Sequence, residues 1–262
     1  MPSFTACDDY NLYVCRQGKL LSSDVGAPEV GQLPFQPQKF DRFDDQYYFL
    51  DGHGQLCCNG FLIATDVRDF SSQFILFRNG TVAWRSLRTF LQLEIHIARL
   101  AYDLLIGSDQ CLYDATGTFL LKDVVDAHTD GNEIVAVKTN GTVEYIGDNT
   151  ERHTALQNIL TARGVKKAVV SNGSIILLSH AGEVVASGEN RYYECGITAD
   201  GVDWIQTLKF PLPVVDIEFN RGIGWAVLSD ESIWVWGFNH PDHPRFLQWY
   251  SETYISPRRL EL

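Results

Sequence analysis

Two segments near the end of the sequence gather the aromatic and arginine side chains that most often anchor protein–protein interfaces. They are residues 189–213 (ENRYYECGITADGVDWIQTLKFPLP) and residues 238–257 (FNHPDHPRFLQWYSETYISP). The candidate partner-binding residues in them are Arg191, Tyr192, Tyr193, Trp204, Arg245, Phe246, Trp249, Tyr250 and Tyr254. The alternative is that several of these rings pack inside the protein as part of outer strands.

The residue types that carry catalysis or bind metals do not form a recognisable site. The sequence has no Gly-x-Ser-x-Gly nucleophile turn, no P-loop and no His-Glu-x-x-His motif. His240 and His243 flank Asp242, but no further ligand is indicated and two prolines explain this segment as a rigid loop. The six cysteines show no Cys-x-x-Cys spacing. We therefore expect no enzyme activity, no cofactor, no metal and reduced thiols.

The charge balance restricts the class of partner. The formal net charge is −12, and the basic pairs Lys166-Lys167 and Arg258-Arg259 are short, so we expect no direct nucleic-acid contact. The N-terminal residues show no signal-peptide pattern. No apolar run approaches the roughly 18 residues that span a membrane. These features predict an intracellular protein, of cytoplasm or nucleus, that binds another protein.

A repeated turn is what must position these segments. Gly18, Gly54, Gly80, Gly141 and Gly182 follow similar strands, and Gln110 and Glu231 occupy the same place in two further copies. Residues four, five and six before each turn position, and two after it, are apolar in all seven copies. Dipeptides such as Asn-Gly supply the positive φ of a tight hairpin. Three successive apolar residues indicate a strand buried on both faces.

Seven hairpins of this kind predict sheets stacked face to face, and hence an all-β, seven-bladed β-propeller formed by residues 1–262 as a single domain. A further glycine ends the second strand at Gly60, Gly147, Gly188 and Gly237. The two aromatic segments follow Gly188 and Gly237, so we expect them to emerge from equivalent points of neighbouring blades. Residues 154–164 are the best helix candidate. The short step from Gly54 to Gly80 suggests a blade without its outer strand.

Three stretches resemble one repeat family. LLSHAGEVVASGENRYYECG, VKTNGTVEYIGDN and VLSDESIWVWGFN share the pattern aliphatic-x-x-x-Gly-x-Val-x-x-x-Gly-x-Asn in whole or in part. This pattern resembles the regulator of chromosome condensation family, which implies a seven-bladed propeller of four-stranded blades. The C-terminal ISPRRLEL looks like the strand that precedes a next repeat. We therefore expect the N- and C-terminal strands to close the ring.

The resemblance leaves three functions open. The family includes non-catalytic adaptors, so we expect a protein–protein interaction module that acts as an adaptor or regulatory subunit. A first alternative is guanine-nucleotide exchange on a small Ras-like GTPase, as the founding member performs. A second is a propeller partner of an electron carrier in diphthamide synthesis and tRNA modification.

Overall fold

The computed structural model describes residues 4–7, 12–16, 19–22, 29–32, 37–43, 46–86, 90–91, 93–147, 164–171, 173–188, 190, 193, 195–196, 204–220, 222–237 and 254–260. The chain divides into two compact units, one of residues 1–109 and 113–120 and one of residues 110–112 and 121–262. The organisation of residues 1–262 as a single domain stays a prediction.

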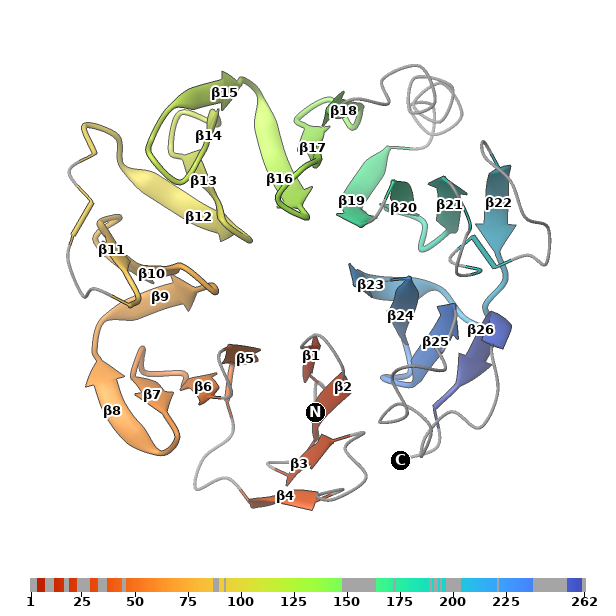
Figure 1. Ribbon diagram of the computed structural model, residues 1–262, viewed down its shortest axis with the longest axis horizontal. Coiled ribbons are helices and arrows are strands. Elements are labelled where there is room, and N and C mark those ends of the chain that lie inside the picture. The colour runs from red at the N-terminus through yellow and green to blue at the C-terminus, as the bar shows by residue number, and fades with distance from the viewer. Residues whose placement is uncertain are drawn as a thin grey trace. The chain divides into compact units, whose positions relative to one another are not determined.

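The regular structure in the described ranges is entirely β, as predicted, and forms seven antiparallel sheets (Figure 1). Each sheet is built from strands that are consecutive in the sequence, and we call the first strand of each sheet its inner strand. The first sheet consists of β1 (Phe4–Cys7), β2 (Leu12–Arg16), β3 (Lys19–Ser22) and β4 (Glu29–Gln32), and the second of β5 (Lys39–Phe43), β6 (Gln46–Leu50), β7 (Leu56–Cys58) and β8 (Phe61–Ala64). The third sheet consists of β9 (Val67–Phe70), β10 (Phe74–Phe77) and β11 (Val82–Trp84). The fourth consists of β12 (Ile97–Ala101), β13 (Leu104–Gly107), β14 (Leu112–Tyr113) and β15 (Phe119–Leu121).

The last three sheets belong to the second unit. They are β16 (Val124–Thr129), β17 (Ile134–Lys138) and β18 (Val143–Ile146); β19 (Val165–Ser171), β20 (Ser174–Ser179), β21 (Val184–Gly188) and β22 (Trp204–Leu208); and β23 (Val214–Asn220), β24 (Ile223–Leu228), β25 (Ile233–Gly237) and β26 (Tyr254–Arg259). In the described ranges there is no helix long and apolar enough to cross a membrane.

The repeated turn has the backbone geometry that the sequence indicates. Gly54, Gly80, Gly141 and Gly182 have φ between 80° and 85°. Gln110 and Glu231, which replace glycine, have φ of 62° and 65°, in the same left-handed region. The alignment of these two positions with the glycines is therefore confirmed, and each of the two side chains is held in a conformation that costs backbone strain.

Hydrogen bonds at five of these turns also reach the residue that starts the following inner strand. The carbonyl oxygen of the turn residue accepts the N–H of the residue that starts the following inner strand. The donor–acceptor pairs are Val67 to Gly54 (3.0 Å), Ile97 to Gly80 (3.1 Å), Val124 to Gln110 (2.8 Å), Val165 to Gly141 (3.0 Å) and Val214 to Gly182 (3.1 Å). The turn and the following strand therefore form one repeated inter-sheet contact.

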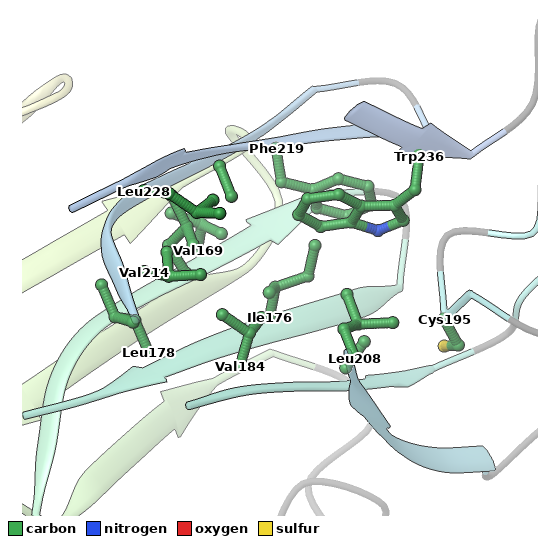
Figure 2. Close-up of a cluster of buried hydrophobic side chains, with 13 residues drawn as sticks. Val169, Ile176, Leu178, Val184, Cys195, Leu208, Val214, Phe219, Leu228 and Trp236 are labelled. Atoms are coloured by element: carbon green, nitrogen blue, oxygen red, sulfur yellow. The ribbon is translucent and has the colours of Figure 1, made fainter. Parts of the chain in front are cut away.

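The core lies between the sheets, where the predicted apolar triplets are buried. Ile176, Leu177 and Leu178 of β20 are each at most 1% exposed. Figure 2 shows one such cluster, in which Val169 and Ile176 of the sixth sheet pack with Phe219 and Trp236 of the seventh. Burial of this apolar surface on both faces of each sheet is the main force that holds neighbouring sheets together.

A glycine opposite Trp236 makes room for the indole. Gly224 of β24 pairs with Trp236 of β25, and a Cβ at residue 224 would lie 2.3 Å from indole carbons. The fully buried ring thus takes the space that any larger residue at position 224 would need.

Three expectations from the sequence concern an outer strand, a helix and the closure of the ring. The step from Gly54 to Gly80 keeps its outer strand, β8, because its strands are only three or four residues long; the expectation of a lost strand there is wrong. Residues 154–163 of the predicted helix lie outside the described residues. β1 pairs with β2 and β26 pairs with β25, in separate sheets, and closure of the ring stays a prediction.

Candidate functional site

The structure describes three of the nine predicted partner-binding residues. Tyr193 is half-buried. Trp204 is the first residue of β22 and Tyr254 the first residue of β26. The other six predicted residues lie outside the described ranges: Arg191, Tyr192, Arg245, Phe246, Trp249 and Tyr250. Their proposed role stays a prediction.

The two aromatic segments leave and rejoin their sheets at equivalent points. Gly188 ends β21 and pairs with Trp204, and Gly237 ends β25 and pairs with Tyr254. We call the end of the sixth and seventh sheets that carries these four residues the loop end. The two sheets share the core of Figure 2, and the Val214–Gly182 hydrogen bond aligns their opposite ends. The prediction of equivalent exit points is therefore confirmed.

Glycine is required at both exit points because the chain passes close to a neighbouring hairpin. A Cβ at Gly188, where φ is 144°, would lie 2.4 Å from Cα of Ser174. A Cβ at Gly237, where φ is 102°, would lie 2.0 Å from the carbonyl oxygen of Gly222. The third strand of each sheet thus crosses against the turn between the first two strands, and only glycine fits there.

The first aromatic segment begins with a short anchored stretch that starts at Asn190, the asparagine that ends the repeat pattern. Asn190 is completely buried, and its Oδ1 accepts the N–H of Cys195 over 2.9 Å. The Cys195 side chain is fully buried in the core of Figure 2. The N–H of Gly196 donates to the carbonyl of Tyr193 over 2.9 Å. Tyr193 therefore sits in a turn that Asn190 and Cys195 attach to the sixth sheet.

The turns at this end of the fifth and sixth sheets are joined by a buried carboxylate. Glu133, which directly precedes β17, accepts the N–H of Gly173 at Oε2 over 3.1 Å and the hydroxyl of Tyr145 at Oε1. Gly173 is in the turn between β19 and β20, next to the Ser174 that contacts Gly188. This hydrogen-bonded contact supports the hairpin turn over which the first aromatic segment leaves its sheet.

Charged side chains on the inner strands join the sixth and seventh sheets. Lys167 Nζ on β19 lies 2.9 Å from Asp216 Oδ1 and 2.5 Å from Glu218 Oε1, both on β23. Burial alone would lower the pKa of the Lys167 ammonium, but the charges of Glu218 and Asp216 outweigh it and raise that pKa above its ordinary value. Lys167 is therefore a permanent cation at this junction.

His128 is a buried neutral imidazole near this cation. It is on β16, is 4% exposed, and its Nδ1 accepts the N–H of Val170 over 3.3 Å. Burial and the positive charge of Lys167 lower its pKa to about 3, with Asp130 acting in the opposite direction. Within the described ranges, His, Cys, Asp and Glu side chains nowhere gather in a group of three that could hold a metal ion.

Comparison with known proteins gives similarity at the level of structure. No protein-family model and no curated protein sequence matches the chain. Yeast RCC1 (Prp20), solved with Kap60 bound to it, matches 98% of this chain and 74% of its own, with a TM-score of 0.57 and 14% identity. Human WBSCR16 matches all of this chain and 82% of its own, with a TM-score of 0.57 and 13% identity.

A third similar structure is BBS1N, solved in complex with ARL6DN. It matches 91% of both chains, with a TM-score of 0.56 and 12% identity. At these identities the likeness concerns the fold. Together with the seven antiparallel sheets and their repeated turns, it shows that the chain has a β-propeller fold like that of the regulator of chromosome condensation.

Proposed function

We propose that this protein is a non-catalytic protein–protein interaction module, and that its partner binds at the loop end of the sixth and seventh sheets. The observation that carries the proposal is the equivalence of Trp204 and Tyr254. Each is the first residue of an outermost strand and pairs with the glycine at which an aromatic segment leaves its sheet. The backbones of these two aromatic residues are therefore held at equivalent positions on two packed sheets, where a partner could use them as anchors.

The arrangement beneath these residues favours binding over chemistry. Glu133, Asn190 and Lys167 have their polar groups engaged in contacts that join turns or sheets. Propellers of similar fold have been solved with other proteins, Kap60 and ARL6DN, which supports a protein partner. An adaptor needs a rigid frame, because a preorganised surface loses little entropy on binding.

Affinity capture from cell extract tests the proposal with the triple variant Trp204→Ala/Trp249→Ala/Tyr250→Ala. The matched control is Phe61→Ala/Phe119→Ala, which removes rings that are 77% and 56% exposed on β8 and β15, in the other unit. We expect one stoichiometric partner that the triple variant loses and the control keeps. Retention of the partner by the folded triple variant would contradict binding at the loop end.

The captured partner also separates the two alternative functions. If it is a small GTPase captured only without nucleotide, and this protein accelerates nucleotide release, guanine-nucleotide exchange replaces passive binding. If it is a small metal-carrying electron donor, the adaptor acts in diphthamide synthesis or tRNA modification.

A further inference from the structure

The inner strands carry a charge at one equivalent position in six consecutive sheets. The residue at this position pairs with the apolar residue that lies four residues before the turn position on the next strand. Its occupants are Lys39, Asp69, Arg99, Asp126, Lys167 and Asp216, so that the sign alternates from sheet to sheet. Thr5 is the uncharged residue at this position in the first sheet.

Two pairs of sheets show the same ion pair at this position, each within one unit. Lys39 Nζ lies 2.7 Å from Asp69 Oδ1, and that oxygen also accepts the N–H of Phe70 over 2.8 Å. Lys167 Nζ lies 2.9 Å from Asp216 Oδ1, which accepts the N–H of Ile217 over 3.0 Å. In both, a lysine reaches forward to the next sheet and binds an aspartate oxygen already oriented by its own backbone.

The pair between the sixth and seventh sheets has a feature that the other pair lacks. Lys167 also binds Glu218, and only a fifth of the Lys167 side chain is exposed, against 39% for Lys39. One partly buried ammonium thus separates two carboxylates on the same strand. Removing it would leave two like charges close together, which costs more than the loss of an exposed pair.

We propose that Lys167 is a positioning residue that holds the sixth and seventh sheets in one fixed arrangement and thereby sets the relative position of the two points at which the aromatic segments rejoin these sheets. This proposal rests on the proposed function only where it concerns the binding of a partner. The ion pair joins β19 to β23, the inner strands of the same two sheets whose outermost strands begin with Trp204 and Tyr254.

Hydrogen exchange measured by mass spectrometry tests this without a partner. The variants are Lys167→Met and the matched control Lys39→Met, which removes the equivalent ion pair from the second and third sheets. We expect Lys167→Met to raise exchange about five- to tenfold in residues 165–171 and 214–220 only. Lys39→Met should act only on residues 39–43 and 67–70. Unchanged exchange in 214–220, or a uniform rise over all sheets, would overturn the proposal.

A conservative variant and a second-site variant separate the electrostatic role of Lys167 from simple packing. Lys167→Arg should restore exchange to the wild-type level, because it replaces the cation. Lys167→Met/Glu218→Gln removes the repulsion between Asp216 and Glu218, so it should recover part of the melting temperature that Lys167→Met loses. A double variant no more stable than Lys167→Met contradicts the electrostatic account.

The other charged groups near this junction are the same in all of these variants. They include Lys166, whose Nζ donates to the carbonyl of Val215 over 2.6 Å, and Asp126 on β16. If the exchange result holds and partner capture by Lys167→Met is nevertheless unaffected, the proposed binding site fails while the positioning role stands.

Discussion

At the scale of single residues, the second unit has two side chains with strongly shifted pKa values on its inner strands. Lys167 is a cation between two carboxylates, and the buried His128 is near enough for that charge to act on its pKa. Burial disfavours a charged side chain unless an opposite charge pairs with it. Lys167 has such partners and stays charged, whereas the buried His128 is neutral. Their consequences for stability have opposite dependence on pH.

His128 makes stability fall at acid pH. Its pKa is about 3 in the folded protein and close to 6.5 in the unfolded chain, so the unfolded state binds the proton more readily in between. The contribution of His128 is complete above pH 6.5 and is lost as pH falls, with a slope of about 1.4 kcal/mol per pH unit. Urea unfolding of wild type and His128→Asn from pH 7 to pH 4 measures it.

Asparagine is a suitable replacement because its side-chain oxygen can accept the Val170 N–H but does not titrate. The stability of His128→Asn should therefore depend less steeply on pH than that of the wild type. Parallel curves for the two proteins would contradict the assignment of a neutral buried imidazole. Lys167 contributes in the other direction, because its raised pKa keeps its stabilisation present until strongly alkaline pH.

At the scale of elements, the repeated unit is a hairpin with a left-handed turn residue whose carbonyl binds the next sheet. Gly182 shows why glycine suits this position, since a Cβ there would lie 2.7 Å from Pro213 and φ is 80°. Gln110 adopts the same backbone conformation although it carries a Cβ, and its backbone carbonyl accepts the N–H of Val124 over 2.8 Å. The hydrogen bond to the next inner strand therefore forms both at a glycine and at a residue with a side chain in the left-handed conformation.

Relief of this strain gives a prediction. Gln110→Gly should raise the free energy of unfolding by about 0.5–1 kcal/mol, because glycine adopts positive φ without steric cost. Gly182→Ala is the reverse change at an equivalent position and should lower it by about 1–3 kcal/mol. Urea denaturation at pH 7 measures both. A Gln110→Gly protein less stable than wild type would show that the glutamine side chain contributes more than its backbone costs.

At the scale of the whole molecule, seven sheets are each formed from consecutive strands. Neither terminal strand is added to the sheet of the other terminus in the described residues. Deleting residues 258–262 would be a poor test of ring closure. Arg258 and Arg259 pair with β25, and the N–H of Leu260 donates to the carbonyl of Ile233. The deletion would destabilise the seventh sheet whether or not the ring is closed.

Distances between labels test closure directly. Arg16, His180 and Ser229 each lie two residues before a turn position, in the first, sixth and seventh sheets. Spin labels at 180 and 229 provide the reference distance for neighbouring sheets of the same unit. A closed ring predicts that labels at 16 and 229 give a similar, narrow distance in double electron–electron resonance. A long or broad distribution for that pair would show that the first and seventh sheets are not neighbours.

Much of this architecture was already determined by the sequence. Three apolar residues before a turn can be buried only in a strand covered on both faces, so seven such triplets specify seven stacked hairpins. Gln110 and Glu231 could be aligned with glycines because their flanks carry the same pattern. The exit points at Gly188 and Gly237 followed from the same repeat, since local turn geometry depends on neighbours in the chain.

Only the tertiary structure decided which polar residues meet between sheets. Lys167 is far from Asp216 and Glu218 in the sequence, and an isolated lysine in a strand shows no preference for a particular carboxylate. The repeat pattern includes Asn190 but does not show its hydrogen bond to the Cys195 N–H, and Cys195 has no sequence signature because its importance depends on burial against the sixth and seventh sheets. Repetition encodes the hairpins, whereas contacts between different repeats depend on how the sheets pack.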